Sequence, residues 1–502
     1  MTLPSPQYTL PSVRHPARQL DDVCLIFLVY HPATVDEWWN VDRVTVDMLP
    51  DVALLKIFDC YVNQARKEEG PGLEHKIQEW HTLVHVCRQW RTIVLGSPCR
   101  LGLRLLCTDR TPVKETLAVW PPLPIVIDQF KPTQMENIIG ALEHNERICQ
   151  IDLFVTNSQL EEVLAAMQQP FPALTDLKIM LDNEMPPVDP ESFLGGSAPR
   201  LQHLDLTCIP FPGLPKILLS TTDLVSLHIW GSPHSGYISP EAMASCLSTL
   251  TRLEVLWLGF ESPLSRPVRL TRRPHPPTRS TLPALTYFWF RGVSEYLEDL
   301  VARVNAPLLE NVRIAFFQQL IFDTPQLAQF LARTPNFQSP VGVDILFQND
   351  HIVVFSSDSR QGLRRGFQLE VSCKQSDWQL SSLAQVCTSS IPRVLIRMVE
   401  HLDIFEDTRK YEPLDWPDDI EGSQWLEVLR PFTALKDLYI SGEFLPRIAP
   451  ALQELAGEHL KEVLPVLESI SLPFNPSGPA LAAVEEFVAA RLLAGHHITV
   501  SH

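Results

Sequence analysis

Apolar side chains near residue 50 repeat with the period of a helix. From Leu54 they follow at i+3, i+4 and i+7 to Tyr61, which places them on one stripe of an α-helix. Pro50 suits the first helical position because it has no N–H, and Asp51 puts negative charge at the positive end of the helix dipole. The pattern therefore predicts a helix that begins at residues 50–51.

A second helical stripe follows from Ile77 to Val94 and ends at Gly96-Ser97-Pro98. The polar stretch between the two stripes, residues 63–78, predicts a solvated loop. Two short helices with this much apolar surface cannot bury all of it against each other. We expect a third element of the chain or a partner protein to cover the rest.

From residue 174 onward the apolar spacing changes to L-x-x-L-x-L, with Pro or Thr two residues before each first apolar position. Successive starts between residues 174 and 309 differ by 27, 23, 29, 32 and 24 residues. Segments 158–167, 240–250, 296–304 and 325–332 have helical spacing, so each unit predicts one short strand and a helical return. The first apolar positions are Leu174, Leu201, Leu224, Leu253, Leu285, Leu309, Leu435 and Leu467.

Over residues 174–472 this pattern resembles a leucine-rich-repeat domain of irregular type. The resemblance implies an α/β fold, a solenoid with a curved parallel sheet and helices. Between residues 316 and 433 the register is not assigned, because Val399-Leu402-Ile404 is the one clear match among strand-like runs at 341–347, 351–355 and 367–373. The family favours Asn or Cys eight residues after the first Leu, where this chain has Asp182, Ile209, Ser232, Glu261, Val293 and Phe317.

A second resemblance rests on residue identities near the start of the chain. Leu49-Pro50-x3-Leu54-Leu55-x-Ile57-Phe58, then Trp80-x2-Leu83-Val84-x-Val86-Cys87-Arg88-x-Trp90-Arg91 and Ser97-Pro98, resemble an F-box. With residues 103–107 and 120–125, the segment is similar to the large set of F-box proteins of basidiomycete fungi. The family implies docking on Skp1, the adaptor of a cullin-based ubiquitin ligase, through Leu49, Pro50, Leu54, Ile57, Phe58, Trp80, Val84, Cys87 and Trp90.

These patterns divide the chain into four expected parts. They are an N-terminal leader at 1–43, an F-box at 44–100, a linker with the first capping repeats at 101–173, and a leucine-rich-repeat substrate-binding domain at 174–502. Two polar insertions interrupt the last part. The Arg-rich segment 263–283 and the acidic stretch 400–421 are either solvated loops or partner-binding segments.

The strand pattern also predicts a binding surface. Side chains of a strand alternate between two faces, so the residues between the leucines share the opposite face of the sheet. Trp, Tyr and Arg dominate the binding energy of protein interfaces, so we expect Trp257, Tyr287 and Trp289 to form the centre of a substrate site with Arg291 and Arg313 at its rim. In the alternative, the Arg-rich segment or a C-terminal helix covers these rings.

Composition and charge exclude several classes of protein. The net charge of −18 argues against a nucleic-acid surface, which needs clustered positive charge. The ten cysteines include no Cys-x2-Cys pair, and the apolar run Val23–Tyr30 is too short to span a bilayer. We therefore expect reduced thiols in a cytoplasmic or nuclear protein with no membrane partner.

Motifs for chemistry are missing from the sequence. It has no Gly-x-Ser-x-Gly, no His-Glu-x-x-His, no phosphate-binding loop and no dinucleotide fingerprint. His81 and His85 lie near Cys87 but lack a second ligand pair at zinc spacing, so we expect them to be structural. We predict no catalytic residue, no metal and no cofactor.

The combined expectation is a non-catalytic subunit of a ubiquitin ligase complex. It would bind Skp1, and through it a cullin, with the F-box and capture an unidentified protein substrate with the repeats. The alternative is a leucine-rich-repeat scaffold that is not coupled to ubiquitination.

Overall fold

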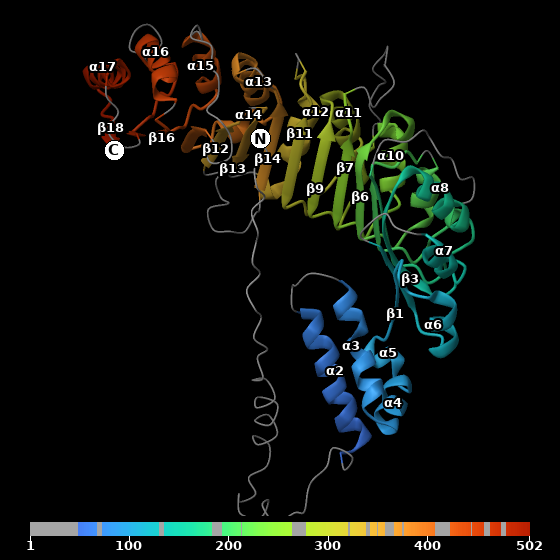
Figure 1. The fold of residues 1–502 in the computed structure, drawn as a ribbon. Coiled ribbons are helices and arrows are strands. Elements are labelled where there is room, and N and C mark those ends of the chain that lie inside the picture. Colours follow the sequence, from blue (N-terminus) through green and yellow to red (C-terminus); the bar gives the residue numbers. More distant parts are fainter. Residues whose placement is uncertain are drawn as a thin grey trace, which may run out of the picture.

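One open sheet of sixteen strands organises most of the described chain (Figure 1). The structure is a computed structural model, and it describes residues 49–67, 73–129, 135–182, 193–211, 213–263, 278–319, 322–337, 342–348, 350–356, 366–373, 376–406, 422–442, 444–455, 462–472 and 478–501. In spatial order the strands are β1 (Leu105–Cys107), β2 (Ile125–Gln129), β3 (Ile148–Val155), β4 (Asp176–Leu181), β5 (His203–Thr207), β6 (Ser226–Ser232), β7 (Val255–Phe260), β9 (Tyr287–Gly292), β11 (Asn311–Phe316), β14 (Gly366–Ser372), β13 (His351–Ser356), β12 (Gly342–Phe347), β15 (His401–Glu406), β16 (Asp437–Ile440), β17 (Ser469–Ser471) and β18 (Thr499–Ser501). A separate parallel pair joins β8 (Ser280–Thr281) to β10 (Val304–Asn305).

Helices cover the outer side of the curved sheet, and the strands line its inner side (Figure 1). The prediction of an α/β fold with a mostly parallel sheet is confirmed, and the open, curved arrangement is compatible with a solenoid. The helices are α6 (Val113–Val119), α7 (Glu136–Leu142), α8 (Asn157–Ala166), α9 (Leu214–Ser220), α10 (Pro240–Leu247), α11 (Ser294–Val301), α12 (Pro325–Arg333), α13 (Ser376–Ser389), α14 (Arg393–Ile396), α15 (Gly422–Leu429), α16 (Leu445–Leu455) and α17 (Pro479–Leu493), with 3₁₀ turns η4 (Phe193–Gly196), η5 (His234–Gly236) and η6 (Pro335–Phe337).

The apolar positions of L-x-x-L-x-L form the core between the sheet and the helices. Every predicted instance contributes a strand, and its three apolar side chains are at most 5% exposed. Neighbouring strands place equivalent positions side by side, so Leu177 pairs with Leu204 and Leu256 pairs with Phe288. Each buried Leu contributes about 2 kcal/mol through the hydrophobic effect, which makes the repeated pattern a main source of stability.

The predicted helical returns are also present. Segments 158–167, 240–250, 296–304 and 325–332 correspond to α8, α10, α11 and α12, with ends that differ by up to three residues. The side chain of Thr156 and that of Gln159 form a capping box that starts α8. Ser239 accepts a hydrogen bond from the amide of Ala242 at the start of α10. These caps satisfy amides that a helix N-terminus leaves without partners.

The parallel arrangement predicted for the repeats breaks down between β11 and β15. Strand β13 runs antiparallel to both of its neighbours, β12 and β14. Only three residues separate β12 from β13, which is too short for the crossover that a parallel pair requires. The three strand-like runs in this segment are strands, but two of the four neighbouring pairs from β11 to β15 are antiparallel.

A helical unit lies at the β1 end of the sheet (Figure 1). It comprises α2 (Asp51–Lys67), α3 (Leu73–Val86), α4 (Arg88–Leu95) and α5 (Pro98–Leu101). The indole N–H of Trp80 donates to the carbonyl of Arg104, 3.1 Å away, just before β1. The unit has its own core, formed by Leu54, Phe58, Val62, Trp80, Leu83, Val84, Ile93, Val94, Leu101, Leu103, Leu105 and Leu123.

Two sequence predictions for this unit are wrong in detail. The predicted single helix from Ile77 to Val94 is broken at Cys87, whose extended backbone lets its Sγ accept a hydrogen bond from the amide of Trp90 at 3.4 Å. The predicted loop at 63–78 is mostly helical, because α2 continues to Lys67 and α3 begins at Leu73. Its Ala, Arg, Lys, Glu and Gln residues favour helices, so polarity alone was a misleading signal.

Several predicted segments lie outside the described residues. They are the leader at 1–43, most of the Arg-rich segment (264–277) and most of the acidic stretch (407–421). No helix within the described ranges is long and apolar enough to cross a membrane.

Candidate functional site

The residues predicted to bind Skp1 separate into two groups. Four of them belong to the core of the helical unit: Leu54, Phe58, Trp80 and Val84 are each at most 2% exposed. The ring of Phe58 packs at a centroid distance of 4.6 Å from that of Trp90. In the free chain these four side chains are accessible only if the unit opens, so their place in the structure is that of core residues.

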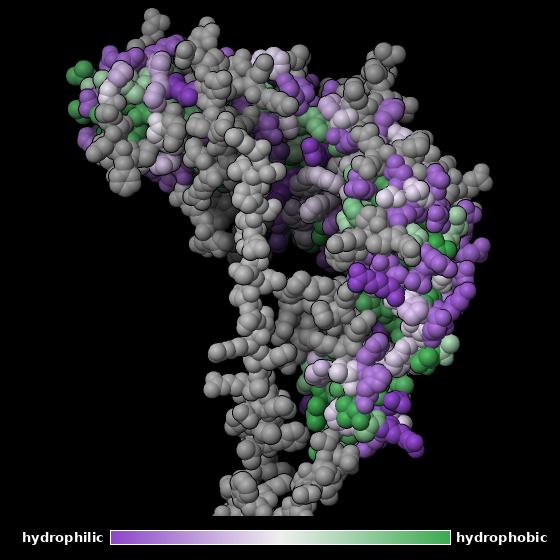
Figure 2. All heavy atoms as spheres, viewed as in Figure 1, coloured by the Kyte–Doolittle hydropathy of each residue, from purple (hydrophilic) through white to green (hydrophobic). Residues whose placement is uncertain are grey.

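The other predicted residues lie at or near the surface of the same unit. Leu49, Ile57 and Trp90 are partly buried against its core, Cys87 is partly exposed and Pro50 is exposed. The structure adds three exposed apolar side chains to them: Val52 at 70%, Tyr61 at 45% and Val86 at 58%. Figure 2 shows hydrophobic side chains gathered on this unit. Of the three, Tyr61 and Val86 lie on the helical stripes seen in the sequence, whereas Val52 had no such signal.

His81 on α3 is partly buried between the helical unit and Trp120, which follows α6. Its ring stacks on Trp120 at a centroid distance of 4.9 Å with an interplanar angle of 8°. Burial, with a smaller contribution from the nearby His85, lowers the pKa of His81 below its usual value. In the part of the chain that the structure describes, no group of three His, Cys, Asp or Glu side chains could hold a metal ion.

On the inner face of the sheet, the structure brings the predicted substrate-site aromatics together. Trp257 on β7 pairs in register with Trp289 on β9, and their ring centroids are 5.5 Å apart. Trp257 also stacks against Tyr287 at 5.9 Å and against His228 at 4.8 Å. The rings therefore form a continuous aromatic row across β6, β7 and β9.

Trp230 extends this row because the strand between it and Trp289 carries a glycine. The two indole rings approach to 4.0 Å above Gly259. A Cβ at Gly259 would lie 2.8 Å from Cε3 of Trp230 and 3.1 Å from Cζ3 of Trp289, so any larger residue there would force the rings to move. The guanidinium of Arg291 lies 5.6 Å from the Trp230 ring centroid, within cation–π range.

We define the aromatic face as Trp230, Trp257, Tyr287 and Trp289, each of which is partly exposed. The C-terminal helix of the alternative does not cover this face, because α17 packs against α16 at the other end of the sheet. Most of the Arg-rich segment of the same alternative, residues 264–277, lies outside the described ranges.

Charged side chains of opposite sign flank the aromatic face, and all of them except Arg291 lie in the register row of Trp257 and Trp289. On the β3–β5 side, Asp152 pairs with Lys178 at 3.2 Å, and Asp205 lies 3.5 Å from His228. Burial raises the pKa of Asp152 above its usual value despite the neighbouring ammonium. On the β9–β11 side, Arg291 and Arg313 form no ion pair with a carboxylate of the described residues. The row therefore runs from a mainly acidic end, across the rings, to a basic end.

Sequence reasoning missed two residues that surround the aromatic face, Asp152 and Gly259. Asp152 lies on β3, ahead of the first assigned repeat, although Ile148-x-x-Ile151-x-Leu153 has the same spacing as the later repeats. Gly259 gave no signal, because its importance depends on two indole rings that arrive from neighbouring strands.

No protein-family model matches this chain, and no curated protein shows significant similarity to it. Its function must therefore be inferred from its own residues and their arrangement.

Proposed function

We propose that this chain is a substrate receptor of a Skp1-cullin-F-box ubiquitin ligase. It would bind Skp1 through an F-box at 44–100 and a protein substrate through leucine-rich repeats. The observation that carries the proposal is that the F-box-like motif folds as a helical unit at one end of a curved sheet, with a core that is distinct from the main core and that Leu105 of β1 completes. This arrangement supports two separate binding surfaces on one chain.

The proposed adaptor surface lies around the start of α2. Pro50 and Val52 are exposed there, with Leu49 and Ile57 partly exposed beside them. Exposed apolar side chains on a small helical unit favour association with a partner protein. Leu54, Phe58, Trp80 and Val84 would then support the shape of this surface from beneath.

The proposed substrate surface is the aromatic face with Arg291 and Arg313. Large aromatic side chains that no helix of the described chain covers are unfavourable in water unless a partner buries them. The chain itself would perform no bond chemistry. Its contribution would be proximity, because holding a substrate near a ubiquitin-carrying enzyme raises the effective concentration of the acceptor lysine.

Co-precipitation of purified Skp1 tests the ligase link. Combining Leu49→Ala, Pro50→Ala and Val52→Asp should reduce Skp1 capture at least tenfold while the unfolding temperature of the sheet stays unchanged. The control is Val466→Asp, which adds the same charge at another exposed Val outside the helical unit, 45% exposed against 70% for Val52, and should leave Skp1 capture unchanged.

Equal capture by the triple variant and the wild type would refute the adaptor surface. If the wild-type chain captures no Skp1 at all, the ligase link fails and the aromatic face becomes the binding surface of a scaffold, the second function that the sequence left open.

A further inference from the structure

The segment where the sheet departs from the parallel pattern has fewer helices beneath it. Four strands are adjacent here, in the order β11, β14, β13 and β12. Along the described chain, helix α12 comes before β12, β13 and β14, and helix α13 comes after them. Helix α12 packs against α11, and α13 packs against α15. The two helices are joined at one end, where the hydroxyl of Thr324 donates to that of Ser390 at 2.6 Å. Away from this junction, the layer beneath β12, β13 and β14 contains a cavity.

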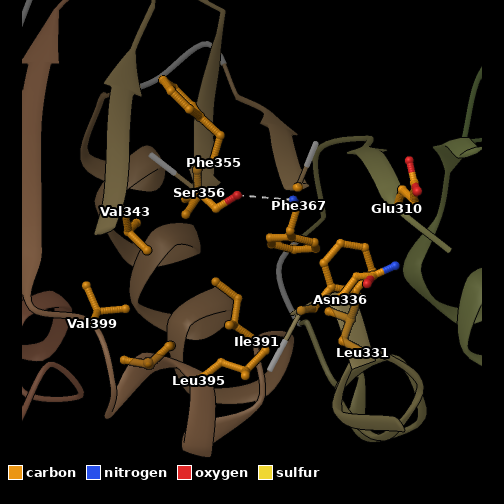
Figure 3. A pocket seen from close by; sticks show the side chains of 14 residues that line it. Glu310, Leu331, Asn336, Val343, Phe355, Ser356, Phe367, Ile391, Leu395 and Val399 are labelled. Atoms are coloured by element: carbon orange, nitrogen blue, oxygen red, sulfur yellow. Dashed lines mark hydrogen bonds between the residues drawn. The ribbon is translucent and has the colours of Figure 1, made fainter. Parts of the chain in front are cut away.

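The cavity has a volume of about 230 Å³ and apolar walls. Figure 3 shows Val343, Ile391 and Leu395 on one side of it and Phe367 and Leu331 on the other. All but Phe367 are at most 8% exposed, so the walls belong to the core of the domain. Side chains this deep leave a void only when no neighbouring group reaches into it.

Size and polarity together define what could occupy this space. An engineered apolar cavity of about 150 Å³ stays dry and binds benzene, and this cavity is larger. Its volume is far too small for a folded partner or a helix. An occupant must therefore be a small, mainly apolar molecule, about the size of two fused rings.

Among the described residues, Glu310, Asn336 and Ser356 are the polar side chains that line the cavity, and the hydroxyl of Ser356 has a hydrogen to donate to an occupant. The hydroxyl of Ser356 accepts a hydrogen bond from the amide of Phe367 at 3.3 Å (Figure 3), and no bond within the described residues uses its own hydrogen. A Cβ at position 366 would collide with this hydroxyl, so Gly366 is what allows Ser356 to sit there. Ser356 is partly exposed and Asn336 is exposed, which places the polar edge of the cavity toward solvent.

We propose that this cavity is a binding site for a small bicyclic apolar molecule with one hydrogen-bond acceptor, which receives the hydroxyl hydrogen of Ser356. The apolar walls bind the ring system, and Ser356 fixes its orientation. The site is separate from the aromatic face and from the helical unit, so it does not depend on the proposed link to Skp1.

Calorimetric titration of the full chain with two matched probes tests the site. 1-Indanone carries one carbonyl acceptor, and indane has the same ring system without it. The wild type should bind 1-indanone about fivefold more tightly than indane, the net effect of one hydrogen bond. Ser356→Ala should remove that difference by weakening 1-indanone alone, which a merely structural role for Ser356 would not do.

A second test of the site uses variants that fill the cavity. Ile391→Phe should weaken both probes at least tenfold and raise the unfolding temperature, because the new ring occupies empty space. Leu395→Phe is a second filling variant from the same wall. The control is Ile238→Phe, the same substitution at a residue of similar exposure outside the cavity, which should lower the unfolding temperature and leave probe binding unchanged.

The proposal is overturned if the wild type binds neither probe, or if the filling variants bind them as well as the wild type does. Equal affinity of the wild type for 1-indanone and indane would overturn the role of Ser356.

Discussion

The indole rings of Trp230 on β6 and Trp289 on β9 approach to a centroid distance of 4.0 Å, although strand β7 separates their backbones. Neighbouring strands lie about 4.8 Å apart, so rings two strands apart meet only if both lean over the strand between them. Gly259 makes this possible because it has no side chain. The aromatic face therefore depends on a residue that contributes no ring to it.

Gly259→Ala should separate the two indoles. The added methyl would lie closer to both rings than van der Waals contact allows, and such overpacking typically costs about 1–3 kcal/mol. Near-ultraviolet circular dichroism should report the changed ring packing, and denaturant unfolding should report the loss of stability. Gly140→Ala on α7, where nothing lies within 4 Å of the added methyl, is the control and should stabilise the chain by about 0.5–1 kcal/mol. Similar spectra for Gly259→Ala and the wild type would show that the packing of Trp230 against Trp289 does not depend on the missing side chain at position 259.

Phe58→Ala should weaken Skp1 binding at least tenfold, and the structure indicates how. Phe58 is fully buried in the core of the helical unit, so its removal leaves a cavity that typically costs about 3–5 kcal/mol. Hydrogen exchange should then show faster opening of α2 and α3, with the sheet unaffected. A variant that retains the exchange protection of the helical unit but loses Skp1 would place Phe58 in direct contact with the adaptor instead.

Arg313→Glu and Trp257→Ala should each reduce capture of the protein substrate at least tenfold, because Trp and Arg carry much of the energy in protein interfaces. Tyr439→Ala provides the control, since Tyr439 lies in the same register row but on β16, away from the aromatic face. Crosslinking of bound proteins through a photoreactive residue at position 228, beside Trp257, or at position 439 gives the measurement. Equal yields of the same crosslinked protein at both positions would argue against a site centred on the aromatic face.

Acid should destabilise the helical unit through His81. Burial lowers the pKa of His81 in the folded chain below the value of 6.5 that it has when exposed, so the unfolded chain binds the proton more readily. The stability that neutral His81 provides is present above pH 6.5 and is lost as the pH falls below it. His81→Phe keeps a ring against Trp120 and should reduce this loss. Hydrogen exchange of the helical unit, measured at one pH above 6.5 and at one pH below it, gives the difference in stability loss between the variant and the wild type.

The sequence predicted the strands and helices whose apolar residues recur at the spacing that burial of one face requires. Leu177 and Phe288 are recognisable because a strand buries alternate positions, and this period is visible without the structure. The antiparallel β13 was not predictable, since an apolar run such as His351–Ser356 fits either strand direction. The helix break at Cys87 depends on a local hydrogen bond that the apolar stripe does not reveal.

The placement of the predicted site residues, though not their role, could be predicted where geometry follows from strand alternation. Trp257 and Trp289 could be placed on one face from spacing alone. Leu54 and Phe58 show the limit of such reasoning, because a family motif marks residues that matter without saying whether they contact a partner or fill a core. Only packing distinguishes those two roles.

Leu117 on α6 lies against the core of the helical unit and against the core beneath the sheet. Together with the bond from Trp80 to Arg104, this shared contact connects the helical unit to the sheet. A protein held on β7 and an adaptor held on α2 would therefore be linked through a packed junction. The curvature of the sheet between its two ends would then set the distance between the captured protein and the adaptor. This distance would decide which lysines of the captured protein come within reach of the ubiquitin-carrying enzyme.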